Sequence, residues 1–322
     1  MGTIKRKLQR TSFYQWAVRE YRKKLLYKEF YLSDQRGKEN TVVFVLDKNM
    51  PHPGLVDRIK AIVCVYYIAK VNKLNFLLYS NLTLRLEDYL EPASNQLDWR
   101  CQENTVSWNK KQVKFFEYRP FKKEPSLYGV AGPRNRQYHC WYYSGHNILQ
   151  ENHMENWEQI WSDMYHELFQ PNARLRTLLD DNLPKEPFAA VHFRFVNALD
   201  KFEEGYESNL TTKEQEDLIT KTILQLEHIQ KQEQKKLLVF ADSKRFLDIV
   251  HEKGYETLDN HNVGHVSFSE DTAVYDKVFI DFYTLSNADK VYCIRGKKLY
   301  DSVFPMYAAI VGRHEYVFQY ID

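Results

Sequence analysis

The feature that most constrains the fold is a repeated alternation of short apolar strands with longer helices. In the first half, residues 41–46 and 75–79 have the pattern of buried strands, and residues 55–73 between them have helical spacing after a turn rich in proline. A strand, helix, strand order predicts two parallel strands with the helix packed on their sheet. The first half is therefore expected to form an α/β layer.

The same alternation begins again in the second half of the chain. Between the halves, residues 81–144 predict short irregular strands and loops, and residues 152–183 have helical periodicity. The later pattern predicts strands at 188–195, 237–241, 265–268 and 290–294, and helices at 212–234, 243–253, 276–287 and 301–311.

The length of 322 residues exceeds what one hydrophobic core usually serves. We expect an N-terminal segment at residues 1–40, a Rossmann-like domain at 41–180 and a second one at 181–322. The fold class is therefore α/β, with two parallel sheets facing a cleft, which is the natural ligand site of such an arrangement.

Composition excludes several classes of protein. Hydrophobic residues make up 43% and charged residues 27%, as in folded proteins, and 45 Lys and Arg against 43 Asp and Glu exclude a dominant nucleic-acid-type field. No glycine-rich nucleotide loop occurs, which excludes the usual dehydrogenase and P-loop motifs. No D-x-D triplet or zinc motif occurs either, so no metal site is predicted. No long apolar run or secretory signal is present, and we expect a cytoplasmic protein.

Positive charge is concentrated at the start of the chain. Residues 1–31 contain nine Lys and Arg and two Glu, interleaved with aromatic residues and leucines. This mixture suits peripheral contact with an anionic membrane surface, here the inner face of the cytoplasmic membrane. The alternatives are a solvated helix packed by its aromatic side and contact with nucleic acid.

The most informative segment for chemistry is the strand that contains His192 and Arg194. Strand alternation sends these two side chains to one face of the sheet and Val191 and Phe193 to the other. A guanidinium at the end of an apolar strand requires an anionic partner. A phosphate suits its planar fork, and an internal ion pair with a carboxylate is the alternative.

Two further strand ends carry polar groups. Asp242 directly follows an apolar strand. Its carboxylate can accept the paired N–H groups of guanine, or it can interact favourably with the N-terminus of the next helix. Ser243 is expected to cap that helix. Near the C-terminus, Asp301 or Ser302 is the expected cap of a helix with Pro305 in its first turn. The N-terminus of such a helix offers backbone N–H groups to a phosphate.

Together these segments resemble the fucosyltransferase superfamily, which includes the α1,6-, α1,2- and protein O-fucosyltransferases and the rhizobial nodulation enzyme. The family's H-x-R-x-x-[DN]-like motif, T-D-S-like strand end and S-x-F-like helix start stand here as His192-Phe-Arg194, Ala241-Asp-Ser243 and Ser302-Val-Phe304. Residues 54–62 are similar to the glycine loop and helix of bacterial members. The resemblance covers residues 41–80 and 188–312.

The resemblance implies a GT-B fold with two Rossmann-like domains and a GDP-fucose site in the C-terminal half. By this resemblance Arg194 holds the donor β-phosphate and stabilises the leaving GDP, and His192 and Asp242 address the guanine. The phosphate contacts come from Ser302 and the backbone of Val303 and Phe304. The implied donor site also includes Asn197 and Ser243, and the N-terminal domain contributes Gly54, Asp57 and Arg58 to the cleft.

The implied reaction is an inverting, metal-independent transfer of fucose from GDP-fucose to a hydroxyl of a glycan or glycolipid, such as a bacterial polysaccharide precursor. No cofactor is implied beyond the donor substrate. Asn197 stands where many relatives carry Asp and cannot act as a base, so we favour Glu204 among Asp200, Glu203 and Glu204. The alternatives are a transferase for another nucleotide sugar and a degenerate nucleotide- or glycan-binding protein.

Overall fold

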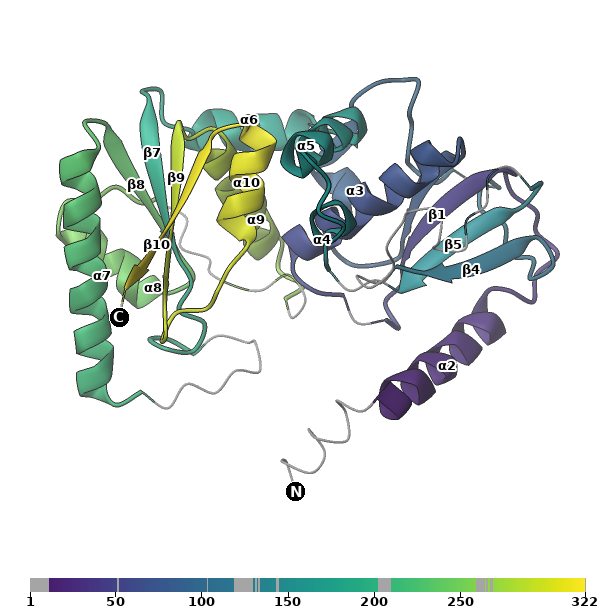
Figure 1. Cartoon of the computed structure of the whole chain (residues 1–322), viewed down its shortest axis with the longest axis horizontal. Helices are drawn as coiled ribbons and strands as arrows, with labels where there is room; N and C mark the ends of the chain where they lie inside the picture. The colour runs from purple at the N-terminus through teal and green to yellow at the C-terminus, as the bar shows by residue number, and fades with distance from the viewer. Residues whose placement is uncertain are drawn as a thin grey trace. The chain divides into compact units, whose positions relative to one another are not determined.

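The computed structural model describes residues 12–50, 52–102, 104–118, 130, 132, 134–142, 145–201, 210–258, 264, 266 and 269–321. The chain divides into two compact units, each built on a four-stranded sheet (Figure 1). The first unit comprises Met1–His52, Lys60–Leu82 and Ser94–Met154, and the second comprises Pro53–Ile59, Thr83–Ala93 and Glu155–Asp322.

The first unit contains a parallel sheet in the order β2-β1-β5-β4. Its strands are β1 (Thr41–Leu46), β2 (Asn75–Ser80), β4 (Val113–Glu117) and β5 (Gln137–Tyr142). All six residues of β1 are buried, because this strand lies inside the sheet with neighbours on both edges. The chain reaches β2 from β1 through α3 (Leu55–Val71), and α4 (Ile148–Glu151) follows β5.

The N-terminal helix α2 (Ser12–Glu29) has two different parts. Near its end, Leu26 is buried in the core of the first unit, and Tyr27 packs against that core. Farther toward its start, Phe13, Trp16 and Tyr21 are 74%, 50% and 63% exposed. Among the described helices, none is long and apolar enough to cross a lipid bilayer.

The second unit contains a parallel sheet in the order β10-β9-β7-β8. Its strands are β7 (Phe188–Phe193), β8 (Lys236–Ala241), β9 (Lys290–Gly296) and β10 (Glu315–Ile321). A small antiparallel pair, β3 (Leu90–Pro92) and β6 (Phe169–Pro171), and the short helix η1 (Leu86–Asp88) complete its minor elements. The helices are α5 (Trp157–Leu168), α6 (Ala173–Asn182), α7 (Thr212–Gln232), α8 (Lys244–Glu252), α9 (Thr272–Ser286) and α10 (Phe304–Gly312).

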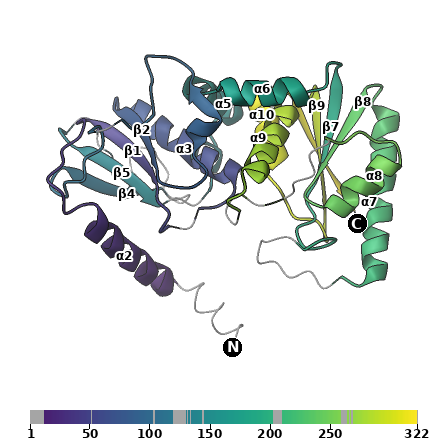
Figure 2. The ribbon, with the colours of Figure 1, turned by 180° about the vertical axis from the view of Figure 1, so that it is seen from behind.

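Helices cover both faces of this second sheet. Figure 2 shows α7 and α8 on one side of the strands and α9 and α10 on the other. Val191 and Phe193 of β7 belong to the core beneath α7 and α8, where Leu226 and Phe246 pack. His192 lies on the other side, beside Phe304 of α10. The alternation predicted for this strand is therefore confirmed.

The expected α/β class with two parallel sheets is confirmed, and several elements differ from the sequence expectation. Residues 152–183 do not form one helical stretch, because β6 separates α5 from α6. The region 81–144 supplies β4 and β5, which complete the first sheet. β10 was not predicted, and of the expected strand at 265–268 only residue 266 is described. The sequence boundary at residue 180 lies within the second unit, since α5 packs on α10 and α6 on α9.

Candidate functional site

The candidate site lies at the carboxyl edge of the second sheet. β7 and β8 are paired in register up to Phe193 and Ala241, so Arg194 and Asp242 leave the sheet side by side. The loop between β9 and α10 reaches the same place, because the Tyr300 N–H donates to the Arg194 carbonyl at 2.8 Å. This is the edge at which open parallel sheets bind their ligands.

Arg194 and Asp242 form an ion pair, with 3.2 Å between Arg194 Nε and Asp242 Oδ2. The Asp242 side chain is 5% exposed and the Arg194 side chain 19%. The carboxylate also accepts the N–H groups of Phe195 and Val196 at 2.6 and 2.8 Å. Burial raises the pKa of Asp242, and the Arg194 charge and these amide groups oppose the rise. The internal ion pair expected as the alternative for Arg194 is therefore present.

The backbone after Arg194 is strained. Val196 has φ of 53°, in the left-handed region that β-branched residues rarely adopt. Its N–H is one of the two that Asp242 accepts. The carboxylate therefore holds this turn together and fixes the orientation of Arg194 at the same time.

His192 lies behind Arg194 on the same face of the sheet. It is 8% exposed, and its Nδ1 has no hydrogen-bond partner among the described residues. Burial, together with the nearby charges of Arg194 and Lys277, lowers the pKa of His192 to about 3. The imidazole is therefore neutral near pH 7 and can both donate and accept a hydrogen bond.

Lys277 is a site residue that the sequence analysis did not identify. It lies on α9, is 4% exposed, and its ammonium group pairs with Asp281 one turn later. Its effect on the pKa of His192 indicates that the ammonium lies near that ring. The sequence contains a signal for this pair, namely a lysine and an aspartate four residues apart in a largely apolar helix.

The N-terminus of α10 differs from the sequence expectation. Val303 is its N-cap and has no side-chain capping bond, whereas Asp301 and Ser302 were the expected caps. Asp301 instead pairs with Arg295 at 2.9 Å. Ser302 is buried, and its hydroxyl accepts the Phe304 N–H at 3.3 Å. Pro305 occupies the first turn as predicted.

Ser243 caps α8 as predicted, since its hydroxyl accepts the Phe246 N–H at 3.1 Å. The same hydroxyl donates to Asp200 at 2.7 Å, and Asp200 also accepts the Arg245 N–H at 3.1 Å. Asp200 is therefore engaged in holding this helix terminus. Asn197 lies half-buried in the turn after Arg194. Glu204, the favoured base, and Glu203 lie outside the described residues.

Gly54, Asp57 and Arg58 belong to the segment Pro53–Ile59, which packs with the second unit. Arg58 is 4% exposed, and its Nε donates to the Pro53 carbonyl at 2.8 Å. Burial raises the pKa of Tyr275 on α9, and the Arg58 charge opposes the rise. The structure therefore assigns Arg58 to the second unit, whereas the sequence analysis assigned it to the N-terminal domain.

In the described part of the chain, no three His, Cys, Asp or Glu side chains lie together as a metal site would require. No protein-family model and no curated protein matches the sequence. Several solved structures match the fold. A mutant of Arabidopsis thaliana FUT1 in complex with GDP is 12% identical, with a TM-score of 0.56 over 97% of this chain and 80% of that one.

Two further structures are similar. The NodZ alpha-1,6-fucosyltransferase soaked with GDP-fucose is 12% identical, with a TM-score of 0.51 over 85% of this chain and 93% of that chain. The fucosyltransferase NodZ from Bradyrhizobium is 11% identical, with a TM-score of 0.50 over 84% and 93%. The likeness confirms the predicted fold of two Rossmann-like domains in the GT-B class.

Proposed function

We propose that this chain is a glycosyltransferase of the fucosyltransferase superfamily that transfers fucose from GDP-fucose to a hydroxyl group of a glycan. The observation that carries the proposal is that the Arg194 guanidinium, held by Asp242, lies at the carboxyl edge of a parallel sheet, where the loop that leads to α10 bonds to the Arg194 carbonyl. Such an edge is where diphosphates bind, and cations and helix N-termini favour them. The solved structures with this fold include complexes with GDP and GDP-fucose.

The reaction we propose is a single displacement with inversion. The acceptor oxygen forms a bond to the anomeric carbon of fucose, the bond from that carbon to the β-phosphate oxygen breaks, and GDP leaves with the electron pair. Arg194, the Ser302 hydroxyl and the backbone N–H of Val303 stabilise the charge that develops on the diphosphate. Because these groups supply positive charge and hydrogen-bond donors, the proposal includes no metal ion. The Phe304 N–H already donates to Ser302, and Lys277 is paired with Asp281, so these two groups are not assigned a direct contact.

Glu204 remains the proposed base that takes the proton of the acceptor hydroxyl. Asp200 is less suited, because one of its carboxylate oxygens already accepts hydrogen bonds from Ser243 and Arg245. We assign His192 to the guanine side, since a neutral imidazole with an unsatisfied buried nitrogen is suited to a heterocycle. We assign Asp242 to the positioning of Arg194 rather than to direct guanine recognition, because its oxygens accept two backbone amides.

The test of the donor is a calorimetric titration of the chain with GDP, GDP-fucose, GDP-mannose and UDP, together with thermal-shift measurements, each with and without EDTA. We expect GDP and GDP-fucose to bind and raise the melting temperature, since a ligand that binds only the native state stabilises it. UDP is expected to bind at least tenfold more weakly. Binding of UDP in preference to GDP would indicate another nucleotide sugar, and loss of GDP binding in EDTA would refute metal independence.

The second candidate, a degenerate binding protein, is separated from the enzyme by turnover. A transferase releases GDP from GDP-fucose, at least slowly to water, whereas a pure binder retains GDP affinity without releasing product. Nucleic-acid binding through the N-terminal basic segment predicts salt-sensitive affinity for DNA or RNA that disappears when the residues before Thr41 are deleted.

We also propose that the exposed part of α2 contacts an anionic membrane surface, where the acceptor is a glycolipid. Phe13 and Trp16 are 74% and 50% exposed, and Lys24 and Lys28 follow on the same helix. Aromatic rings at the headgroup level and cations near anionic lipids favour this contact. The variant Phe13→Ala/Trp16→Ala is expected to sediment at least threefold less with phosphatidylserine vesicles, and equal sedimentation with phosphatidylcholine vesicles would contradict the proposal.

A further inference from the structure

One face of β10 carries aromatic side chains at alternate positions, namely Tyr316, Phe318 and Tyr320. Phe318 is 60% exposed and Tyr320 57%. Residues two apart on a strand lie about 7 Å from each other on the same face, so these rings form a stripe about 13 Å long. Aligned exposed rings on a protein surface indicate an interaction site.

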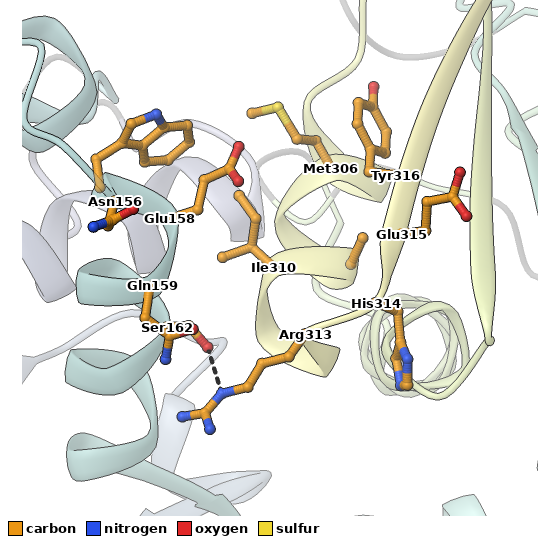
Figure 3. Close-up of a pocket in the computed structure, with 12 residues that line it drawn as sticks. Asn156, Glu158, Gln159, Ser162, Met306, Ile310, Arg313, His314, Glu315 and Tyr316 are labelled. Carbon is orange, nitrogen blue, oxygen red and sulfur yellow. Dashed lines mark hydrogen bonds between the residues drawn. The ribbon is translucent and has the colours of Figure 1, made fainter.

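The stripe is continuous with a pocket of about 660 Å³ that Tyr316 also lines. In Figure 3, Glu158 and Gln159 of α5 lie on one side of this pocket, Met306 and Ile310 of α10 in the middle, and Tyr316 on the far side. Its lining combines apolar side chains, the Trp157 ring, carboxylate and amide groups, and the basic side chains Arg313 and His314. We call the pocket and the stripe together the aromatic groove.

The aromatic groove leads toward the candidate donor site. Across the sheet, Phe318 pairs with Cys293 and Cys293 with His192, so these residues form one row on the same face. Tyr320 pairs with Arg295, which follows Ile294, the partner of Phe193. Tyr320 is thus in the row of Arg194, two strands away, which corresponds to about 10 Å. The stripe runs from the pocket to the edge where Arg194 lies.

The chemistry of the aromatic groove favours an uncharged ligand. Its arginines are engaged, because Arg313 pairs with Asp163 at 2.7 Å and Arg295 pairs with Asp301 at 2.9 Å. The Arg295 guanidinium also lies 4.9 Å from the centre of the Phe318 ring and helps to hold it. No phosphate-binding cluster remains, whereas flat rings suit the C–H faces of sugars and Glu158, Gln159 and Glu315 suit their hydroxyl groups.

We propose that the aromatic groove binds a neutral oligosaccharide of several residues and delivers its end to the donor site. This inference rests on the proposed function and specifies its acceptor as a sugar chain rather than a monosaccharide. The pocket anchors the remote part of the chain, and Phe318 and Tyr320 support the part that approaches Arg194. Pairing of β10 with a second copy of the chain is the competing use of this edge strand.

The test measures binding to an array of neutral hexasaccharides and disaccharides (malto-, cello-, manno- and chito-series) by the whole chain and by the variant Phe318→Ala/Tyr320→Ala. Both rings are exposed, so the variant is expected to fold. The matched control is Leu32→Ala/Leu224→Ala, which removes two side chains, 66% and 58% exposed, that lie outside the aromatic groove. We expect at least one hexasaccharide to bind better than its disaccharide, and the β10 variant to bind it about tenfold more weakly.

GDP affinity, measured on the same samples, is expected to be equal in all three proteins. Unchanged hexasaccharide binding in the β10 variant, or no binding of any hexasaccharide by the unmodified chain, overturns the inference. A dimer of the unmodified chain that the β10 variant converts to monomer also overturns it, in favour of pairing between copies. Failure of GDP to bind refutes the proposed donor instead. The array still tests whether the aromatic groove binds an oligosaccharide.

Discussion

Replacement of Arg194 by alanine is expected to reduce the release of GDP from GDP-fucose about a thousandfold while the second unit stays folded. The guanidinium is the group best placed to stabilise charge on the leaving diphosphate, and removal of one such donor from an active site costs a factor of 100 to 1,000. Loss of its full charge places the effect at the upper end of that range. The variant leaves the buried Asp242 carboxylate without its cation, which lowers the stability. Asp242 keeps its two backbone amides, so the turn after β7 retains that restraint and the unit is expected to stay folded.

The control for Arg194→Ala is Arg176→Ala, which removes an exposed arginine of the same unit that pairs with Glu91 at 3.0 Å. It is expected to leave GDP release unchanged. Arg194→Lys keeps the positive charge but lacks the planar fork of the guanidinium. Its rate of GDP release is expected to lie between that of Arg194→Ala and that of the unmodified chain. Release of GDP by Arg194→Ala within threefold of the unmodified rate would show that the diphosphate binds elsewhere.

Replacement of Asp242 by asparagine is expected to destabilise the second unit by about 3 kcal/mol, because it breaks a buried ion pair and leaves a cation without its partner. The asparagine also has one acceptor oxygen where the carboxylate has two, so one of the amides of Phe195 and Val196 loses its bond. Urea unfolding followed by circular dichroism measures the stability. GDP affinity is expected to fall as well, since Arg194 is no longer held in position.

The double variant Arg194→Met/Asp242→Asn separates the two effects of Asp242. Removing both charges is expected to restore part of the stability, because no unpaired cation remains. The GDP affinity is not expected to recover, because the arginine that binds the phosphate is also gone. Asp289→Asn is the control, since Asp289 pairs with Lys235 on the surface, where an ion pair contributes little. If Asp242→Asn unfolds at the same urea concentration as the unmodified chain, the assigned role of this carboxylate is wrong.

The alternation of apolar strands and helices was enough to predict β1, α3, β2 and the order from β7 to α10, because buried parallel strands have a strong local signal. It was not enough for β10, whose exposed aromatic side chains alternate with half-buried ones and whose strand has a neighbour on one side only. β5 was missed for another reason. Its place beside β1 depends on a pairing with residues almost 100 positions earlier, which no local pattern contains.

The candidate site was partly predictable on the same grounds. Strand alternation placed His192 and Arg194 on one face, and the capping preference of serine predicted the position of Ser243. The partner of Arg194 could not be chosen from the sequence, because an ion pair with Asp242 depends on how β7 and β8 pair. Lys277 was missed because a single lysine in a helix is usually solvated, and only the packing of α9 places it near His192.

The hydrogen bonds from the Phe195 and Val196 N–H groups to the Asp242 carboxylate join residues almost 50 positions apart in the chain. During synthesis, the strained turn at Val196 therefore emerges well before the group that holds it. A ribosome-bound chain that ends before β8 lacks Asp242 and cannot fix that turn. The entropy cost of closing the segment between the turn and Asp242 must be paid before the two hydrogen bonds can form. Competence to bind nucleotide should accordingly appear late and all at once, when the second sheet is completed.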